Sequence, residues 1–340
     1  MNLVFRNNLE IKRLTKVDFE TKEKDFVNLR NRIFSHEDMY PGIDLWFKNR
    51  VIPGIHDSNR IAYIGYYNDT AIASAIVKID KSAKFCHLNI DDRFQDCNFG
   101  ELFFILMTFD VGRLAEEIHF TLPESLWDKR EIFFKSFGFQ YSHSCGYRYR
   151  SFEKELHCSS PYTTVYRNLK KKLEKITSLL VINGKGLDNG LLLSVKPKYV
   201  KKILTGAKTV EIRKKFNPNY VGKRVFIYSS SPIKQIVGEA TISKIHTKEP
   251  LALWDQFKSF VGCTEEEFIK YVDSIEKACA IELSEVRGFN KPVDLGQIND
   301  FMRERLHPPQ SYLKLDNQNI WKEVITYTAM HQNEVKFRVL

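Results

Sequence analysis

A six-residue segment, Lys208–Arg213 (KTVEIR), holds the residues whose types and spacing are best suited to chemistry. Its polar members alternate with two β-branched apolar residues, so a strand here would place Thr209, Glu211 and Arg213 on one face. Lys208 would lie close to that face, at the preceding turn. An ammonium, a carboxylate and a guanidinium together suit a ligand with hydrogen-bonding edges or phosphate groups. The same alternation is typical of a solvated strand face, and both interpretations stay open.

The elements around this segment would hold it in place. Leu191–Val195 has the apolar character of a strand, and a helix follows that begins at Pro197, whose missing N–H has no partner in a first turn. Gly206, just past the last apolar residue of that helix, is the usual left-handed stop before a new strand. Further strands are expected over 224–228, 236–245 and 278–286, with helices that begin at 250 and 265. The segment therefore belongs to a small, β-rich domain.

Seven separated motifs follow one another in this region, namely SVKPKY, ILTGAKTVEIRK, VFIYSSSP, IVGEATI, LW, AIELSEV and PPQSY. In this order they resemble the ASCH domain, over about residues 191–315. The resemblance implies a PUA-like barrel of five or six strands with flanking helices, whose cleft receives RNA, a nucleotide or a modified base. The ligand-binding residues that it implies are Lys196, Lys208, Thr209, Glu211, Arg213, Ser229, Ser230, Gln310 and Ser311.

The ASCH resemblance also implies two candidate hydrolytic activities. Some small ASCH proteins remove the acetyl group of N4-acetylcytidine, and others are reported as ribonucleases. The amidohydrolases carry G-x-K-T-x-T-x-R at the turn, with the lysine and the second threonine catalytic. Lys208 and Arg213 match this pattern, whereas Glu211 stands at the second threonine. A hydrolase of this kind would use Lys208 as the base and Glu211 as its acid/base partner.

The N-terminal half alternates strands with helices. The pattern predicts strands at 10–14, 61–67, 71–79, 85–90, 117–122, 139–141 and 147–156, and helices at 100–115 and 125–137. A strand, a helix that starts at a glycine-containing turn and a further strand make a βαβ-type unit. Such a unit has an anion site at the helix N-terminus.

Two stretches of this half, HLNIDDRFQDCNFGELFFILM and ESLWDKREIFFKSFGF, resemble the GNAT acyltransferase family. The resemblance implies acetyl-CoA as cofactor, with its pyrophosphate on the backbone amides of a Q/R-x-x-G-x-G/A loop. Asn98 replaces the first glycine of that loop, and asparagine tolerates a left-handed backbone better than most residues. The implied cofactor-binding residues are Leu88, Ile90, Gln95, Cys97, Asn98, Phe99, Gly100 and Glu101.

Acyl transfer to an amine needs a base, an acid and a strand edge that polarises the thioester carbonyl. Asp91 follows the strand expected at 85–90, and Tyr147 begins a late strand near the expected thioester, so these two are the candidate catalytic residues. Asp91 also suits a turn and Tyr147 also suits sheet packing, so structural roles stay open. Phe134 occupies the place of the family's tyrosine that often protonates the departing thiolate, so another acid or solvent would be needed.

The composition, with 43% hydrophobic and 13% aromatic residues, is that of a globular protein. No apolar run approaches the roughly 20 residues of a membrane span, and the first residues lack the pattern of a secretory signal. Six cysteines without C-x-x-C pairs or histidines at zinc spacing favour free thiols in a reducing cytoplasm and no metal site. His87 and His119 are expected to be core histidines rather than bases.

Charge is divided unevenly along the chain. Residues 1–158 carry 22 Lys and Arg against 23 Asp and Glu, whereas residues 159–340 carry 30 against 19, a surplus of 11. A basic surplus in one domain is typical of a polyanion-binding module, because each neutralised phosphate releases counterions. Part of the surplus lies in a helix expected over Tyr162–Leu180, whose basic face either contacts nucleic acid or is solvated.

These observations predict a two-domain protein of mixed α+β and α/β character. The expected division is a GNAT-like mixed sheet with helices at 1–158, a basic linker helix at 159–186, an ASCH barrel at 187–325 and a tail at 326–340. The leading hypothesis is an acetyl-CoA-dependent N-acetyltransferase whose ASCH domain binds RNA, a nucleotide or a modified base. The alternatives are an ASCH-based hydrolase and a nonenzymatic RNA-binding regulator with a degenerate GNAT domain. The sequence leaves the oligomeric state open.

Overall fold

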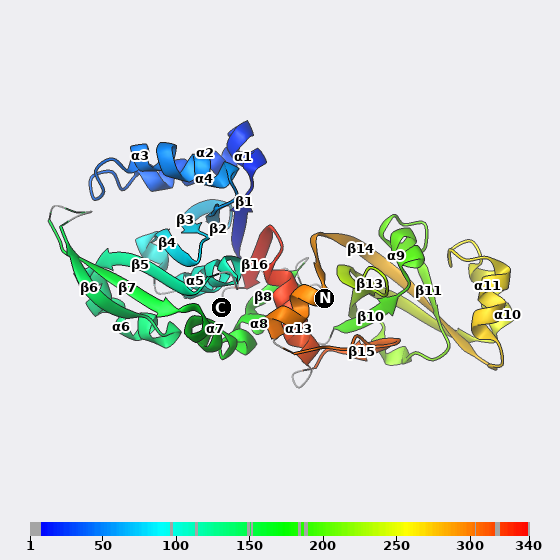
Figure 1. The fold of residues 1–340 in the computed structure, drawn as a ribbon. Coiled ribbons are helices and arrows are strands. Elements are labelled where there is room, and N and C mark those ends of the chain that lie inside the picture. The colour runs from blue at the N-terminus through cyan, green and yellow to red at the C-terminus, as the bar shows by residue number, and fades with distance from the viewer. Residues whose placement is uncertain are drawn as a thin grey trace. The chain divides into compact units, whose positions relative to one another are not determined.

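The computed structural model describes residues 8–95, 98–112, 115–147, 150, 152–182, 185–186, 190–302, 304–316 and 320–338. The chain forms two compact units, one of residues 1–186 with 329–340 and one of residues 187–328. Each unit has its own sheet and its own helices (Figure 1). The expected two-domain architecture is therefore confirmed. Across the described residues, no helix combines the length and the apolar character that crossing a bilayer requires.

The first unit is built on a ten-stranded sheet in the order β6-β7-β5-β4-β3-β2-β1-β16-β8-β9. Among the described strands, β4 and β5 run parallel and the other neighbours are antiparallel. The bounds are β1 (Asn8–Leu14), β2 (Arg60–Tyr67), β3 (Thr70–Lys78), β4 (Ser82–Ile90), β5 (Glu117–Pro123), β6 (Gln140–Gly146), β7 (Glu155–Pro161), β8 (Leu180–Ile182), β9 (Lys185–Gly186) and β16 (Glu334–Arg338).

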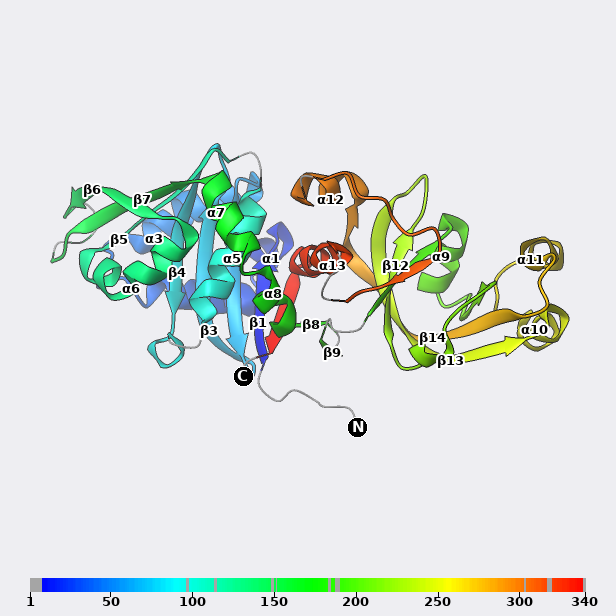
Figure 2. The ribbon, with the colours of Figure 1, turned by 90° about the horizontal axis from the view of Figure 1, so that it is seen from below.

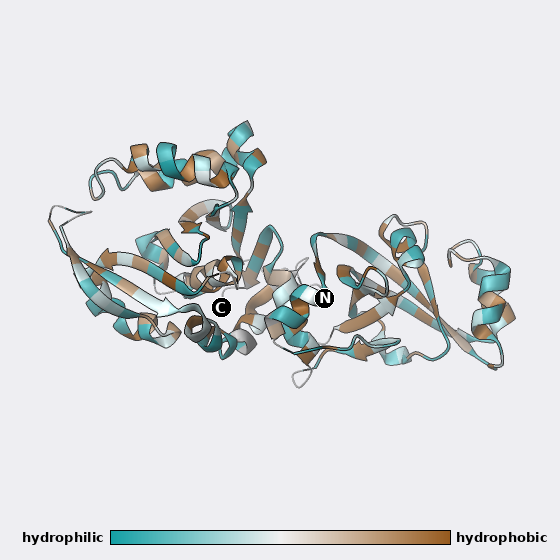
Figure 3. Cartoon of the chain, viewed as in Figure 1, coloured by the Kyte–Doolittle hydropathy of each residue, from teal (hydrophilic) through white to brown (hydrophobic). Residues whose placement is uncertain are grey.

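Helices cover both faces of this sheet (Figure 1). One face carries α1 (Lys16–Thr21), α2 (Lys24–Phe34), α3 (Ile43–Trp46), a π-helical turn (Phe47–Val51) and α4 (Ile52–His56). The other carries α5 (Phe99–Val111), α6 (Glu124–Phe137) and α7 (Tyr162–Lys170). A 3-10 turn (Asp92–Phe94) precedes α5, and α8 (Leu173–Leu179) leads into β8, which lies near β16 and β1 in Figure 2. Hydrophobic and hydrophilic segments alternate along α1–α4 in Figure 3, as they do in amphipathic helices that cover a sheet.

Two local features fix the centre of this sheet. The turn between β2 and β3 places Asn68 and Asp69 in the left-handed conformation, with φ of 46° and 65°, which matches the twist of the paired strands. Gly65 of β2 faces α5, where an added Cβ would come within 2.9 Å of the ring of Phe103. The hairpin expected around Asn68 and Asp69 is thus confirmed, and the glycine allows α5 to lie close to the sheet.

The second unit has a six-stranded sheet in the order β11-β14-β13-β12-β10-β15. Its strands are β10 (Leu191–Val195), β11 (Val210–Arg213), β12 (Arg224–Ser229), β13 (Gln235–Lys248), β14 (Ala278–Asp294) and β15 (Tyr312–Lys314). Its helices are α9 (Pro197–Leu204), a 3-10 turn (Pro218–Tyr220), α10 (Pro250–Phe257), α11 (Glu265–Val272), α12 (Leu295–Met302) and α13 (Ile320–Met330). The strand and helix starts expected from the sequence are reproduced within a few residues.

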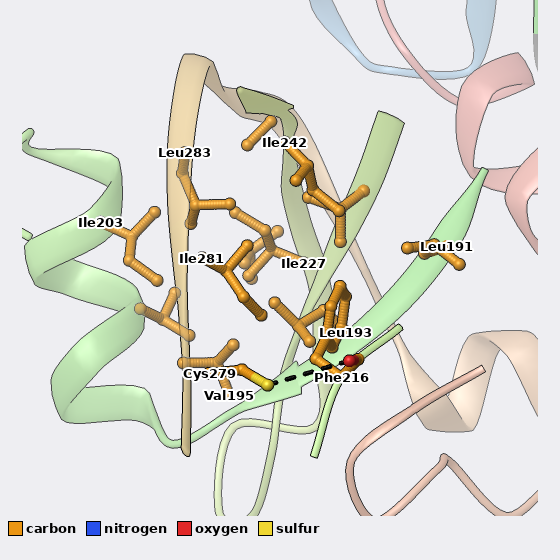
Figure 4. Close-up of a cluster of buried hydrophobic side chains, with 14 residues drawn as sticks. Leu191, Leu193, Val195, Ile203, Phe216, Ile227, Ile242, Cys279, Ile281 and Leu283 are labelled. Carbon is orange, nitrogen blue, oxygen red and sulfur yellow. Dashed lines mark hydrogen bonds between the residues drawn. The ribbon is translucent and has the colours of Figure 1, made fainter. Parts of the chain in front are cut away.

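The second unit has two hydrophobic clusters, and all four residues of β11 are buried. One includes Leu193, Ile227 and Ile281 from three strands of the sheet, and Figure 4 shows these side chains pointing toward one another. The other joins Val210 and Ile212 of β11 to apolar residues of α10 and α11. Both faces of β11 are therefore buried, which decides the environment of the polar residues that alternate with Val210 and Ile212.

The structure divides the chain differently from the expectation on either side of the second unit. Residues expected in a single linker helix, Tyr162–Leu180, form α7 and α8, which are separated at Lys171–Lys172 and belong to the first unit. The tail expected at 326–340 instead contributes β16, which pairs with β1 and β8. Val335 and Phe337 of β16 are buried at 2% and 0% exposure, because alternate residues of a strand point to the same face.

A buried ion pair fixes the returning segment to the centre of the first unit. Arg13 of β1 contacts Asp110 of α5, with Nε 2.6 Å from Oδ2, and the hydroxyl of Tyr63 donates to the same oxygen at 2.6 Å. The guanidinium also donates to the carbonyl oxygens of Met330 at 2.7 Å and Gln332 at 2.5 Å. One side chain thus ties β1, α5 and the segment that leads into β16.

Replacing Arg13 with methionine is expected to destabilise the first unit by about 3–5 kcal/mol, because Asp110 would keep a buried charge without its partner. The matched control is Lys16→Met, which removes an exposed pair with Glu20 and should cost at most about 0.5 kcal/mol. Urea unfolding of both variants, with hydrogen exchange of the β1 and β16 amides, measures the difference. An equal loss of unfolding free energy in the two variants would show that this ion pair does not anchor β16.

Candidate functional site

The charged side chains of the segment Lys208–Arg213 are buried in the second unit. Lys208, Glu211 and Arg213 are only 3%, 6% and 7% exposed. The expected alternation is confirmed, because Val210 and Ile212 join the cluster with α10 and α11. In the register of β11 with β14, Glu211 lies opposite Ile281 and Arg213 lies opposite Cys279. The interpretation as a solvated strand face is therefore wrong.

Glu211 lies between two cations. Its Oε2 is 3.1 Å from Nζ of Lys208, and its Oε1 is 3.0 Å from NH2 of Arg213. Taking three charges out of water is costly unless each is paired and hydrogen-bonded. These three residues, here called the ion triad, meet that condition and keep one positive charge in excess.

Lys208 is saturated within the ion triad. Its Nζ donates to the carbonyl oxygens of Val210 at 2.7 Å and Val261 at 2.6 Å, in addition to the contact with Glu211. These three acceptors match the three N–H donors of an ammonium group. The ammonium also lies 5.2 Å from the ring centroid of Tyr199. Lys208 is thus held as a charged donor, and it can act as a base only after one of these contacts is lost.

Arg213 connects β11 to two other segments. Its NH2 donates to the carbonyl oxygen of Ser194 at 2.6 Å, and its NH1 donates to the hydroxyl of Ser311 at 3.3 Å. The hydroxyl of Ser194 in turn donates to the carbonyl oxygen of Pro309 at 2.5 Å. Nε of Arg213 is buried and has no hydrogen-bond partner in the described part of the chain. Arg213 therefore fixes the segment before β15 and keeps one donor without an acceptor.

The other residues expected to bind a ligand surround the ion triad at varying depth. Lys196, Gln310 and Ser311 are exposed, Thr209 and Ser230 are partly buried, and Ser229 is buried. Of these, Ser311 is joined to the triad through Arg213. Thr209 donates its backbone N–H to the carbonyl oxygen of Phe260 at 3.1 Å, which holds the loop before α11 against β11.

That loop was not expected to belong to the site. Lys202 of α9 donates to the carbonyl oxygen of Gly262 at 2.6 Å, and the neighbouring Val261 accepts from Lys208. Gly262 has a φ of 68°, and an added Cβ would lie 3.1 Å from Cβ of Lys208. A glycine two residues before the capping pair of Thr264 and Glu267 does indicate a turn in the sequence, but not the lysines that the turn contacts.

Replacing Glu211 with glutamine is expected to destabilise the second unit by about 3–5 kcal/mol, because Lys208 and Arg213 would remain as buried cations without a counter-charge. Chemical denaturation followed by tryptophan fluorescence measures the loss. The control is Glu266→Gln, which neutralises an exposed carboxylate of α11 and should leave the free energy of unfolding nearly unchanged. A Glu211→Gln variant as stable as this control would contradict the structural role of the ion triad.

In the first unit, the parallel strands β4 and β5 separate early. They pair only where Ser82–Lys84 faces Glu117–His119, although β4 continues to Ile90 and β5 to Pro123. Beyond Lys84, the pairings that the structure describes join β4 to β3 and β5 to β7. The edge of β4 toward β5, which includes Leu88 and Ile90, therefore has no described strand partner. Free backbone groups on such an edge are suited to polarise a carbonyl.

Helix α5 begins shortly after this edge. Its N-cap, Asn98, has a φ of 59° and a ψ of 11°, the left-handed conformation that the sequence predicts. Phe99 is buried with its ring stacked on Phe94, and an added Cβ at Gly100 would lie 3.6 Å from the side chain of Ile90. The first N–H groups of a helix lack intrahelical acceptors, so this end of α5 suits an anion such as phosphate.

Of two further residues of the expected cofactor loop, the structure describes only Gln95. Gln95 is exposed, and its side-chain amide donates to Asp92 at 2.5 Å. Cys97 lies outside the described residues. Gln95 follows the 3-10 turn that precedes α5.

Glu101 in the first turn of α5 would repel an anion if it were free. It is instead paired with Lys172 at 2.8 Å and Lys175 at 3.2 Å. Burial alone would raise the pKa of Glu101, but the hydrogen bonds from the two lysines outweigh it and lower the pKa. Part of the basic surplus that follows residue 159 therefore neutralises the start of α5.

The two residues expected to be catalytic in this half occupy different environments. Asp91 accepts from the guanidinium of Arg93 at 2.9 and 3.0 Å and from its backbone N–H at 3.2 Å, and these contacts lower the pKa of Asp91 to about 2. A carboxylate with so low a pKa is a weak base at neutral pH. Tyr147 is 58% exposed and lies in a turn after β6, not in the strand expected at 147–156. Gly146, with a φ of 58°, ends β6, and the next strand begins at Glu155.

Phe134 and His87 are core residues. The ring of Phe134 stacks on Trp127 at 5.6 Å and contacts Phe104 at 5.9 Å, an aromatic environment in which a tyrosine hydroxyl would have to find a polar partner. His87 shares a hydrogen bond of 2.9 Å with Ser74, and burial lowers the pKa of His87 to about 3. The expectation that His87 is a satisfied core histidine is confirmed.

Comparison with known proteins finds similarity over the second unit in sequence and similarity to solved structures over parts of the chain. Residues 189–301 match a family model described as a domain of unknown function, DUF365. The ASCH domain-containing ribonuclease of Zymomonas mobilis is 29% identical over 133 residues, which are 39% of this chain and 88% of that protein.

Two solved structures illustrate the two similarities. The crystal structure of ASCH from Zymomonas mobilis is 28% identical with a TM-score of 0.36, over 40% of this chain and 94% of that one. An acetyltransferase of the GNAT family from Desulfovibrio desulfuricans is 11% identical with a TM-score of 0.36, over 45% of this chain and 99% of that one.

Proposed function

We propose that this protein is an acyl-CoA-dependent N-acyltransferase that carries an RNA- or nucleotide-binding domain, with acetyl-CoA as the cofactor. The observation that carries the proposal is the open edge of β4 next to the start of α5. A strand edge offers backbone groups to a thioester carbonyl, and a helix N-terminus offers N–H groups to a pyrophosphate. The first unit provides both within one short stretch of chain.

The residues of this stretch fit the cofactor. The backbone amides at 98–101 would hold the pyrophosphate, since Asn98 already has the left-handed conformation and Gly100 keeps the backbone accessible. Leu88 and Ile90 would border the acyl chain along the edge of β4, and Gln95 would lie at the entrance to the loop. When bound, acetyl-CoA supplies an activated acyl group.

The surroundings of Asp91, Phe134 and Tyr147 decide which of them we propose as a proton donor or acceptor in the first unit. We assign Asp91 to the geometry of the loop before α5, because its contact with Arg93 keeps it ionised. Phe134 has no hydroxyl and lies in the aromatic core, so the departing thiolate would take its proton from solvent. Tyr147 is exposed and remains a candidate acid.

The second unit is proposed to bind RNA or a nucleotide. The support is the surplus of 5 positive charges over residues 187–328, 22 Lys and Arg against 17 Asp and Glu, and the 29% identity to an ASCH domain-containing ribonuclease. Because the ion triad is buried, the proposed contacts fall to the more accessible residues around it, chiefly Lys196 and Ser311. Arg213 would act through Ser311, to whose hydroxyl its guanidinium donates.

A second candidate function is hydrolysis by the second unit, and the similarity to a ribonuclease favours it. Lys208 would serve as the base and Glu211 as its partner, after a ligand displaces one of the contacts that saturate Lys208. This activity differs from the first in its product, because RNA fragments would form without acetyl-CoA.

Replacing Asn98 with valine is expected to weaken acetyl-CoA binding at least tenfold, because a β-branched residue does not tolerate a φ of 59°. Asn98→Gly keeps the left-handed conformation accessible and should bind as the wild type does. Calorimetric titration of the full-length protein with acetyl-CoA measures the affinities, and melting temperatures confirm that both variants fold. Absence of binding by the wild type would reject the proposed cofactor.

Replacing Lys196 with glutamine is expected to reduce the slope of log affinity against log salt for single-stranded RNA by about one, because one phosphate contact is lost. Lys129→Gln, the same charge change on an exposed position of α6 in the first unit, should leave the slope unchanged. Fluorescence anisotropy of a labelled RNA at several salt concentrations gives the slopes. Equal slopes in all three proteins would contradict the assignment, and RNA fragments in these samples would favour the second candidate function.

A further inference from the structure

Three histidines of the first unit stack on one another across neighbouring strands. His119 of β5 and His157 of β7 have ring centroids 5.3 Å apart at 25°, and His157 and His143 of β6 have centroids 4.8 Å apart at 14°. The strands lie side by side in the order β6-β7-β5, as Figure 1 also shows. These residues, here called the imidazole ladder, are not among the site residues assigned above.

The imidazole ladder lies on the face of the sheet away from α5. Along β5 the buried Ile118 and Phe120 alternate with the partly buried Glu117 and His119, and Phe120 contacts Phe104 of α5. Nitrogens of nearly parallel rings point in parallel directions, so they cannot converge on one metal ion. In agreement, the described residues include no group of three His, Cys, Asp or Glu that could hold a metal.

A hydroxyl orients each end of the ladder. Ser82 Oγ lies 3.1 Å from Nδ1 of His119 and 3.5 Å from Oε1 of Glu117. When Ser82 donates to the Glu117 carboxylate, it accepts from Nδ1–H of His119, and this tautomer leaves Nε2 with its lone pair. At the other end, Ser142 Oγ lies 2.9 Å from Nδ1 of His143 and 3.1 Å from Nδ1 of His157.

The surroundings of His119 and His157 favour the neutral form of both rings. Burial, followed by Lys84 and by the imidazole of His157, lowers the pKa of His119, and Lys78 adds to this effect while Glu117 opposes it. Burial and the neighbouring His143 likewise lower the pKa of His157. A neutral imidazole with a free Nε2 is the form that can accept a proton near neutral pH.

His119 also marks the point where β4 and β5 separate. The pair of Lys84 and His119 is the last of their parallel register, and the open edge of β4 begins directly beyond it. His119 thus lies at the root of the gap in which the thioester carbonyl is proposed to sit. Its side chain is 19% exposed, so part of the ring is accessible to a small group.

We infer that His119 is the general base of the proposed acyl transfer, with Ser82 and Glu117 orienting its ring and His157 and His143 stacked behind it. The inference rests on the proposed function and names its proton acceptor. An amine nitrogen of the acceptor bonds to the acyl carbon, and its N–H proton passes to Nε2 of His119. The C–S bond breaks, the sulfur keeps the electron pair, and the proton returns from His119 through solvent to the thiolate. Amine and thioester thus give amide and thiol with no net change in protons.

The test measures CoA release from acetyl-CoA by the full-length protein as a function of pH, with ethanolamine as a primary-amine probe. His119→Gln should lower the rate at neutral pH by about 10²–10⁴-fold and remove the acid limb of the profile, with acetyl-CoA affinity unchanged. His56→Gln on α4 is the matched control and should keep the wild-type profile.

Two variants of positioning residues should shift the acid limb of the pH–rate profile in opposite directions. His157→Gln removes a neighbour that lowers the pKa of His119, so the acid limb should move to higher pH. Glu117→Gln removes the carboxylate that raises the pKa of His119, so the acid limb should move to lower pH. A purely structural role for the ladder would lower rates without these opposite shifts, which would overturn the inference.

Binding and proton transfer are separated by a second readout. The imidazole Cε1–H resonance of His119, assigned by comparison with His119→Gln, should titrate below the range of a free histidine and should shift when acetyl-CoA is added. If acetyl-CoA binds and this resonance does not respond, the inference is overturned while the proposed function stands. If calorimetry detects no acetyl-CoA binding, the proposed function fails and the inference falls with it.

Discussion

The ion pair between Arg13 and Asp110 is the contact on which the first unit depends. It joins β1 to the last turns of α5, and Tyr63 of β2 donates to the same carboxylate. Because α5 is a rigid rod of 13 residues, fixing its end also fixes its start beside the open edge of β4. The same guanidinium also holds the segment that leads into β16. In chain order, the second unit lies between β9 and β16, which both belong to the sheet of the first unit. The proposed cofactor loop and the returning strand thus have one anchor.

Buried charge has a different role in the second unit. The ion triad contributes little net stability by itself, since the Coulomb attraction mainly offsets the cost of desolvation. Its contacts are specific, however: Lys208 holds the loop before α11 through Val261, and Arg213 holds β10 and the segment before β15 through Ser194 and Ser311. Each of these contacts would be lost if its segment moved away from the triad. The triad therefore positions the loops around it, and the surface residues on those loops are left to contact a ligand.

In the first unit, the surroundings of a titratable group, rather than its residue type, decide how readily it exchanges a proton. Asp91 is kept ionised by Arg93, and His87 is kept neutral by burial, so neither exchanges a proton readily at neutral pH. His119 has partial burial, cationic neighbours and a carboxylate within reach of the same serine. Groups in such intermediate environments are the ones whose protonation can change during a reaction.

The sequence by itself determined the local structure and the two families that the chain resembles. Period-two alternation identified β11, the Asn68–Asp69 turn identified the central hairpin, and the tolerance of asparagine for φ above zero identified the conformation of Asn98, because these depend on neighbouring residues alone. The tertiary structure decided which charges are buried, since Arg213 contacts Ser194 of β10 and Ser311 before β15, while Lys208 contacts Val261 before α11. It also placed β16 in the first sheet and brought His119, His157 and His143 together from three strands. Contacts between residues far apart in the chain leave no periodic pattern, so only the folded chain reveals them.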